Sequence, residues 1–310
     1  FFEDYYFPEN ISKENIDIYH MPQNGIGFSQ AISCKKVVTI HDLIPYVMPE
    51  TVGRGYLLKF LKEMPIIIGN SDGIITVSEF SKRDILKYFP IDESKIFVTP
   101  LAADAKYTPL DKLHCKNFLE KAYNLNNPFL LYLGGFSERK NAASAITAFS
   151  KVYKDLSENY NLVIVGDYRD SGQKLMKLTN ELNMLSHVIF AGFVPEEHLP
   201  LFYNSCDAII YPSFYEGFGL PPLEAMNCGT PVIASNLTSI PEVVGDTGIL
   251  INPYDIKDIS LAIGTLLSSE NLRSELSAKA LLRAKQFSWQ NTASRTLKVY
   301  ESVYHNASTS

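Results

Sequence analysis

Two glutamates stand eight positions apart in the stretch FYEGFGLPPLEAM, which covers residues 214–226. Glu216 is followed by Gly217 and Gly219, and Glu224 comes after a Pro-Pro pair. Glycine lacks a Cβ, so this loop can approach a ligand closely, and the prolines set the φ angle that a helix needs at its first positions. The free N–H groups at such a helix start form an anion site suited to a phosphate.

The two carboxylates do not hold that phosphate, because like charges repel. They can accept hydrogen bonds from neutral hydroxyl groups instead. One glutamate on the loop and another about one turn into the helix fit a ligand with hydroxyls on both sides of a phosphate, such as a nucleotide sugar. The spacing alone is equally compatible with Glu224 complementing the helix dipole and with Glu216 lying exposed to solvent.

A second polar cluster follows the apolar run at 129–134. In LGGFSERKN, residues 133–141, Arg139 and Lys140 stand at the expected start of the next helix. Cations at a helix start oppose the helix dipole, but these two can neutralise a diphosphate, arginine as a fork and lysine as a point charge. The pair therefore favours a diphosphate site.

Three stretches of the chain together carry a family resemblance. They are ITVSEFSKRDI (75–85), LGGFSERKN (133–141) and the stretch from GFVP to INPYD (192–255). This sequence resembles the retaining GT-B glycosyltransferases of family 4, the glycosyl transferases group 1 type, over residues 36–300, and it is most like bacterial mannosyltransferases. The fold that the resemblance implies is α/β, with two Rossmann-like doubly wound domains facing a cleft.

The resemblance also implies roles for the matching residues. Glu216 would hold the donor sugar as a catalytic residue, Glu224 would hold the ribose hydroxyls, and Arg139 and Lys140 would neutralise the diphosphate. Many relatives have arginine at the position of Gly135, so phosphate binding here would depend on Arg139 and Lys140. The implied donor-binding residues are Gly135, Arg139, Lys140, Phe193, Val194, Gly217, Phe218, Gly219, Leu220 and Glu224, with Phe193 and Val194 beside the base.

A histidine, His41, ends the apolar run in VVTIHDLIP, residues 37–45. The resemblance places it near the donor sugar as a second catalytic residue. A lone histidine is otherwise typical of a structural role, and Asp42 is expected to fix the loop.

The chain contains no D-x-D pair, so we expect no metal ion and no cofactor beyond a nucleotide-diphosphate sugar as co-substrate. The resemblance implies front-face displacement with retention, in which the departing phosphate takes the acceptor's proton. GDP-mannose is the expected donor, and a glycan or lipid-linked sugar of bacterial surface polysaccharide synthesis is the expected acceptor. Two alternatives are a nucleotide-sugar-binding protein without transferase activity and a GT-B nucleotide-sugar epimerase.

Short apolar runs alternate with helical patterns along the chain, which predicts βαβ units and buried parallel strands. The predicted strands are 36–40, 73–77, 95–99, 129–134, 162–166, 187–192, 207–212, 231–235 and 248–252.

The predicted organisation places an acceptor-side domain at 1–107, a donor-binding domain at 108–285 and a terminal helix at 286–310 that crosses back to the first domain. The proline-containing segment 100–127 is predicted to connect the two α/β domains. The chain begins closer to TIHD than relatives do, so the first domain is expected to be shortened.

Composition narrows the class of protein further. The 310 residues are 46% hydrophobic, enough for two cores, and a net charge of −6 argues against a nucleic-acid partner. The sequence has no C-x-x-C pair and no membrane-spanning run, so we expect a cytoplasmic protein, either free or peripheral at the inner face of the cell membrane. The amphipathic stretch RGYLLKFLKEMPIII, residues 54–68, is compatible with contact to an acidic membrane and with an ordinary core-facing helix. The sequence leaves the oligomeric state open.

Overall fold

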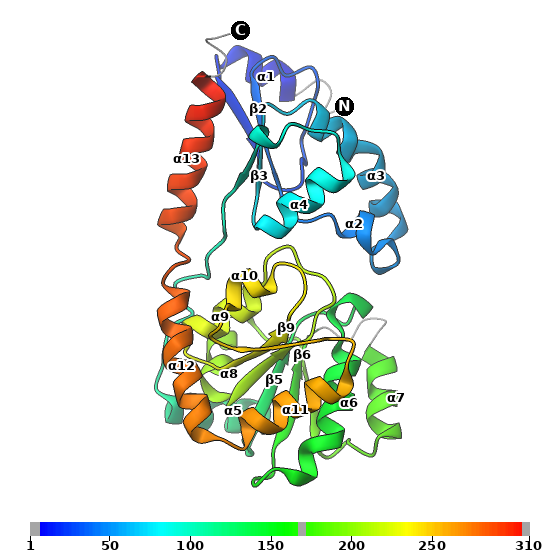
Figure 1. The fold of residues 1–310 in the computed structure, drawn as a ribbon, viewed down its shortest axis with the longest axis vertical. Helices are drawn as coiled ribbons and strands as arrows, with labels where there is room; N and C mark the ends of the chain where they lie inside the picture. Colours follow the sequence, from blue (N-terminus) through cyan, green and yellow to red (C-terminus); the bar gives the residue numbers. More distant parts are fainter. Residues whose placement is uncertain (1–6, 167–171, 306–310) are drawn as a thin grey trace. The chain divides into compact units, whose positions relative to one another are not determined.

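The computed structural model describes residues 7–166 and 172–305, and the chain divides into two compact units. Unit 1 comprises Phe1–Leu101 and Ser288–Ser310, and unit 2 comprises Ala102–Phe287. Each unit has a parallel sheet with helices packed on it, so the predicted pair of Rossmann-like units is confirmed (Figure 1).

The described residues of unit 1 form a sheet of four parallel strands in the order β1-β2-β3-β4. The strands are β1 (Ile18–Met21), β2 (Lys35–Ile40), β3 (Gly73–Thr76) and β4 (Ile96–Val98). The helices of the unit are α1 (Phe7–Lys13), α2 (Ile44–Val47), α3 (Arg54–Gly69), α4 (Glu79–Tyr88) and α13 (Trp289–His305), with short 3-10 turns η2 (Pro49–Thr51) and η3 (Glu93–Lys95). Strand β1 is the one strand of this sheet that the sequence did not predict.

Both faces of the first sheet are buried, since successive side chains of a strand point to opposite faces. Val38 on β2 joins a core that includes Met64 of α3, whereas Val37 joins Val299 and Val303 of α13. Helix α13 lies so close to β3 that a Cβ on Gly73 would come within 2.7 Å of Val303. The last helix therefore completes the core of unit 1.

In unit 2 the part of the chain that the structure describes forms a sheet of six parallel strands in the order β10-β9-β8-β5-β6-β7. The strands are β5 (Phe129–Leu133), β6 (Asn161–Val165), β7 (Val188–Gly192), β8 (Ala208–Tyr211), β9 (Val232–Ser235) and β10 (Ile249–Ile251), and all six were predicted. This is the doubly wound order, in which the chain runs outward in both directions from the central pair β5 and β8. Ligands in such sheets bind beyond the carboxyl ends of that central pair.

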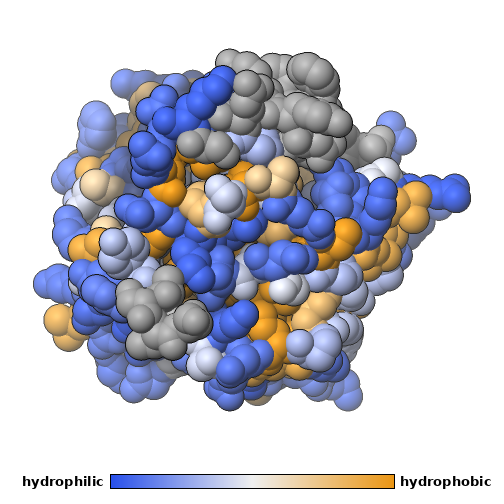
Figure 2. Space-filling model, turned by 90° about the horizontal axis from the view of Figure 1, so that it is seen from above, coloured by the Kyte–Doolittle hydropathy of each residue, from blue (hydrophilic) through white to orange (hydrophobic). Residues whose placement is uncertain are grey.

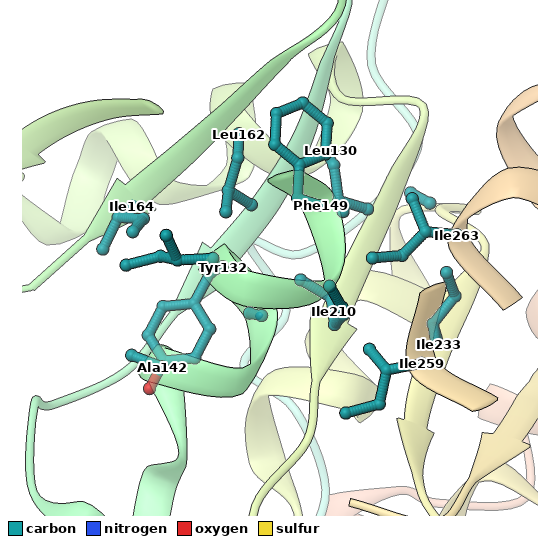
Figure 3. Close-up of a cluster of buried hydrophobic side chains, with 14 of the residues drawn as sticks. Leu130, Tyr132, Ala142, Phe149, Leu162, Ile164, Ile210, Ile233, Ile259 and Ile263 are labelled. Carbon is teal, nitrogen blue, oxygen red and sulfur yellow. The ribbon is translucent and has the colours of Figure 1, made fainter. Parts of the chain in front are cut away.

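Helices cover the sheet of unit 2. They are α5 (Lys112–Tyr123), α6 (Ala142–Val152), α7 (Gly172–Glu181), α8 (Leu199–Ser205), α9 (Leu220–Asn227), α10 (Ile240–Val244), α11 (Ile256–Leu267) and α12 (Glu270–Ala284), with 3-10 turns η4 (Glu138–Lys140), η5 (Tyr153–Asp155) and η6 (Glu196–His198). Figure 3 shows Phe149 of α6 and Ile263 of α11 packed with Leu130 of β5 and Ile210 of β8. This core holds the central strands in place.

The segment 100–127 is more than the connection that the sequence predicted, because it contains helix α5. Asp111 caps the helix by accepting a hydrogen bond of 2.6 Å from the backbone N–H of His114. The rings of Phe118 and Tyr123 contact His198, which anchors α5 in unit 2.

Within the described residues, no helix is long and apolar enough to cross a bilayer. On the face drawn in Figure 2, hydrophobic residues are interspersed among hydrophilic ones.

Candidate functional site

The loops that follow β5 and β8 meet at the carboxyl ends of these two strands. The backbone N–H of Phe214 donates to the carbonyl oxygen of Arg139 at 2.8 Å. Asn141, in the left-handed conformation with φ of 56°, donates from Nδ2 to the carbonyl oxygens of Pro212 and Pro253, both at 3.0 Å. The two polar clusters of the sequence are therefore one cluster in space, at the switch point of the sheet.

Glu216 forms ion pairs with both cations of the β5 loop. Its Oε2 lies 2.9 Å from Nη1 of Arg139 and its Oε1 lies 2.7 Å from Nζ of Lys140. The residue is 7% exposed, so the alternative of a solvent-exposed glutamate is wrong. Burial alone would raise the pKa of the Glu216 carboxyl, but Lys140 and Arg139 outweigh it and hold this pKa below its ordinary value.

Tyr211, the last residue of β8, connects the same groups. Its hydroxyl donates to Oε1 of Glu216 at 2.8 Å and accepts from Nζ of Lys140 at 2.7 Å. Burial raises the pKa of this phenol well above its ordinary value, so Tyr211 stays a hydrogen-bond donor at neutral pH. Sequence reasoning missed it, because a tyrosine at the end of an apolar strand looks like a core residue.

Taken together, the side chains of Arg139, Lys140 and Glu216 carry a net charge of +1. These side chains are mostly buried, and the effective dielectric constant around them is lower than in water. Their net charge therefore attracts an anion more strongly than the same charge in water would. The sequence assigned the cations and Glu216 to different parts of a ligand. The structure places all three within ion-pair distance of one another, so an anionic ligand would share Arg139 and Lys140 with Glu216.

The glycine loop leads directly into α9. Gly219 precedes the helix with φ of 119°, and a Cβ there would come within 2.8 Å of Cδ1 of Ile240. Leu220 is the first residue of the helix, and Pro222 is buried. Gly219 therefore meets two requirements that only glycine satisfies together, a positive φ and a close approach.

Glu224 is the fifth residue of α9, and its side chain is mostly buried. The helix-dipole alternative does not explain this position, because that effect is confined to the first turn. The Tyr203 hydroxyl donates to Oε2 of Glu224 at 2.7 Å. Burial raises the pKa of the Glu224 carboxyl, and hydrogen bonds from Tyr203 and Tyr107 offset part of this rise. A neighbouring ion pair joins Lys106 to Glu196.

Three further predicted positions lie around this edge of unit 2. Phe193 follows β7 and is 78% exposed, while Val194 is buried. A Cβ on Gly135 would meet no atom within 4 Å, so the surface beside the β5 loop is open there. The exposed ring of Phe193, directly after the carboxyl end of β7, is available for stacking on a planar group.

His41 belongs to unit 1, where it follows β2. Its Nε2 lies 2.9 Å from the carbonyl oxygen of Pro22, and its backbone N–H donates to Oδ1 of Asn24 at 2.9 Å. A carbonyl can only accept, so Nε2 carries the proton and Nδ1 is left for another partner. Asp42 accepts a hydrogen bond of 3.0 Å from the N–H of Ile44, which fixes the loop as expected.

Among residues 7–166 and 172–305, no group of three histidine, cysteine or carboxylate side chains is arranged to hold a metal ion.

Comparisons with known proteins agree with this geometry. Residues 116–283 match the family described as Glycosyl transferases group 1, and residues 2–107 match Glycosyltransferase Family 4. The chain is 34% identical to the O-antigen chain mannosyltransferase B of Escherichia coli over 86% of this chain and 70% of that protein. It is 32% identical to the serotype-specific mannosyltransferase WbdA of E. coli over 84% of this chain, but it spans only 32% of that protein.

Solved structures with the same fold are more distant in sequence. The sucrose-phosphate synthase of Thermosynechococcus elongatus superimposes with a TM-score of 0.80 at 23% identity, covering 97% of this chain and 77% of its own. Anabaena Alr3699/HepE, solved in complex with UDP and glucose, gives a TM-score of 0.79 at 19% identity, covering 95% of this chain and 80% of its own. At these identities the likeness shows the fold.

Proposed function

This chain belongs to the glycosyl transferases group 1 family, and we propose that it transfers a mannosyl residue from a nucleotide-diphosphate sugar, GDP-mannose, to a glycan or lipid-linked acceptor. The observation that carries the proposal is the buried cluster of Arg139, Lys140 and Glu216 at the switch point, with Glu224 on the helix that follows. The mannosyltransferases of E. coli to which the chain is similar support mannose and surface polysaccharide synthesis.

Each polar group of the cluster has a place along such a donor. Arg139 and Lys140 bind the diphosphate, because they are the cations of a cluster with net positive charge. Glu224 accepts from the ribose hydroxyls with the lone pairs that its bonds from Tyr203 and Tyr107 leave over. Glu216 accepts from the sugar hydroxyls, and the exposed ring of Phe193 stacks on the base. The rest of the glycine loop, Gly217 to Leu220, surrounds the sugar and the diphosphate.

The proposed reaction is a front-face displacement with retention. The bond from the anomeric carbon to the phosphate oxygen breaks, and a bond to the acceptor oxygen forms on the same face. The acceptor's proton passes to the departing phosphate, whose negative charge Arg139 and Lys140 stabilise. The negative charge of Glu216 stabilises the positive charge that develops on the sugar. His41 is proposed to contact the sugar through Nδ1. None of these steps requires a metal ion.

A transfer assay tests the proposal directly. The protein is incubated with GDP-mannose and a lipid-linked glycan acceptor, with and without EDTA, and the product's anomeric configuration is read by NMR. We expect an α-linked product and a rate that EDTA does not change. In Glu216→Gln we expect turnover to fall about tenfold, equivalent to about 1.4 kcal/mol, because the charge that favours the transition state is removed.

The two alternatives give different results in the same assay. A nucleotide-sugar-binding protein would bind the donor and neither transfer nor hydrolyse it. An epimerase would change the configuration of the sugar without an acceptor. Either result would overturn the proposal.

We also propose that α3 of unit 1 contacts the inner face of the membrane. A lipid-linked acceptor would reside in that membrane. Helix α3 is a core helix on one face only, where Phe60 and Met64 are buried. Its other face exposes Leu58 by 60% and Leu61 by 37%, and lysines flank these leucines. Apolar side chains among lysines are typical of helices that lie on acidic membranes.

Vesicle flotation tests this contact. We expect binding to vesicles that contain anionic lipid and loss of binding in Leu58→Ser/Leu61→Ser. Leu113→Ser provides the matched control, since Leu113 is 68% exposed on α5 of unit 2. Equal binding of all three proteins would contradict the proposal.

A further inference from the structure

The loop at 236–239, between β9 and α10, holds the backbone of Glu216. The N–H of Glu216 donates to Oγ1 of Thr238 at 3.2 Å. The hydroxyl of Ser239, a buried residue, donates to the carbonyl oxygens of Glu216 at 2.9 Å and Phe218 at 2.8 Å. Two adjacent hydroxyl groups therefore fix both backbone polar groups of the residue whose carboxylate pairs with the two cations.

Thr238 makes its contact from an unfavourable backbone conformation. Its φ is 58°, and among the described residues the other non-glycine positions with positive φ are all asparagines. Asparagine tolerates the left-handed region, whereas a β-branched residue there is a genuine outlier. Backbone strain of this kind persists where the surrounding contacts enforce it, and it is concentrated at functional sites.

We infer that Thr238 is a positioning residue for Glu216, and that its hydroxyl contact with the Glu216 N–H is maintained at the expense of backbone strain. The inference rests on the function proposed above for Glu216. The carboxylate of Glu216 reaches Arg139 and Lys140 from this backbone at 2.9 and 2.7 Å. A small displacement of the loop would move the carboxylate relative to the donor sugar, and misplacement by about 1 Å is sufficient to slow catalysis strongly.

Three substitutions separate the hydroxyl from the strain. Thr238→Ser keeps the hydroxyl, whereas Thr238→Ala and Thr238→Gly remove it, and only glycine adopts the positive φ freely. We expect kcat to follow the hydroxyl: within about twofold of the parent for serine, and roughly fivefold lower for alanine and glycine, the loss expected for one hydrogen bond. KM for the donor should stay within about twofold, because Glu216 acts in the transition state.

Thermal stability should rank differently from activity. The glycine variant should melt above the alanine variant, because both lack the hydroxyl and only alanine retains the strain. If kcat instead ranks with Tm, so that glycine is much more active than alanine, Thr238 acts only through the fold and the inference is wrong. Parental kcat in both variants would also overturn it.

A double-mutant cycle with Glu216→Gln completes the test. If Thr238 acts through Glu216, Thr238→Ala should lower kcat by less in the Glu216→Gln background than in the parent. Equal losses in the two backgrounds would contradict the inference. Failure of the proposed function looks different, because the parent itself would then transfer no mannose to the acceptor. Parental turnover in Glu216→Gln would reject the role proposed for Glu216. An impaired Glu216→Gln beside a fully active Thr238→Ala rejects only the positioning role.

Discussion

The hydroxyl of Tyr203 and the carboxylate of Glu224 lie 2.7 Å apart, joining α8 to α9. Burial raises the pKa of the Glu224 carboxyl, and the hydrogen bond from Tyr203 opposes this rise because it favours the charged form. Tyr203→Phe should therefore raise this pKa further. Because the proposed ribose contact uses the carboxylate, we expect the acid limb of donor affinity to move to higher pH.

Titration calorimetry with the nucleotide-diphosphate sugar between about pH 5 and pH 8 measures this shift. Tyr160→Phe is the matched control, since Tyr160 makes an equivalent bond of 2.9 Å to Asp207 at the amino end of β8. An unmoved acid limb in Tyr203→Phe would separate Tyr203 from ribose binding.

Glu216 and Glu224 should affect the pH dependence of the free energy of unfolding in opposite directions. The folded-state pKa of Glu216 lies below its ordinary value of 4.5. Its contribution is therefore complete above the unfolded pKa and is lost as pH falls through the folded pKa. The folded-state pKa of Glu224 lies above 4.5, so its ionisation destabilises the fold at neutral pH, and this cost disappears as pH falls through the raised pKa.

Chemical unfolding of Glu216→Gln and Glu224→Gln over a pH series checks both signs. At neutral pH we expect the first variant to be less stable than the parent, because it removes the carboxylate that pairs with two mostly buried cations. The second should be more stable than the parent. The opposite ranking would contradict the assigned directions.

Lys140→Met should weaken diphosphate binding selectively. The side chain of Lys140 is 16% exposed and its Nζ pairs with Glu216, so the substitution removes a charge-assisted contact of about 1.5 to 3 kcal/mol. Affinity for the nucleoside diphosphate should fall at least tenfold, while affinity for the nucleoside stays within about twofold. Lys151→Met on the exposed face of α6 is the control. Equal losses for both ligands would point to damage of the fold.

Tyr300→Phe should lower the stability with which α13 packs on the first sheet. The Tyr300 hydroxyl lies 2.7 Å from Nδ1 of His20 on β1, and loss of one such bond costs about 1 kcal/mol. Trp289, the single tryptophan of the chain, begins α13 and reports on it by fluorescence. We expect the midpoint of denaturant unfolding, followed by Trp289 fluorescence, to fall in Tyr300→Phe. It should stay unchanged in Tyr304→Phe, because the Tyr304 ring is half-exposed. Equal midpoints for all three would show that the bond contributes nothing.

Much of the fold could be predicted because its signals are local. Nine of the ten described strands coincide with the short apolar runs that predicted them. The missed strand, Ile18–Met21, is a short edge strand with the sequence IYHM, which lacks such a run. Helix α5 was missed because half of its residues, KLHCKNFLEKAY, are polar and most of these lie in its first half, so its start resembles a polar connection.

The site could be predicted in part, for a related reason. The glycine loop and the cationic pair are local motifs, and the structure places each of them after a strand, as predicted. Their pairing was not predicted, because Arg139 and Glu216 are far apart in sequence and meet only through the pairing of β5 with β8. The roles of Tyr203, Tyr211 and Thr238 likewise depend on long-range contacts, which no spacing rule contains.

The return of α13 to the first sheet has a consequence for synthesis on the ribosome. Val37 and Ile75 are covered by Val299 and Val303, so one face of the first sheet has no cover until the last helix is made. At 5–20 residues per second, synthesis of unit 2 takes roughly 10 to 40 seconds. Throughout that interval Val37 and Ile75 of the first sheet are exposed to solvent. Exposed apolar surface of this kind is what chaperones bind. Unit 2, a continuous segment, can fold before unit 1 is finished.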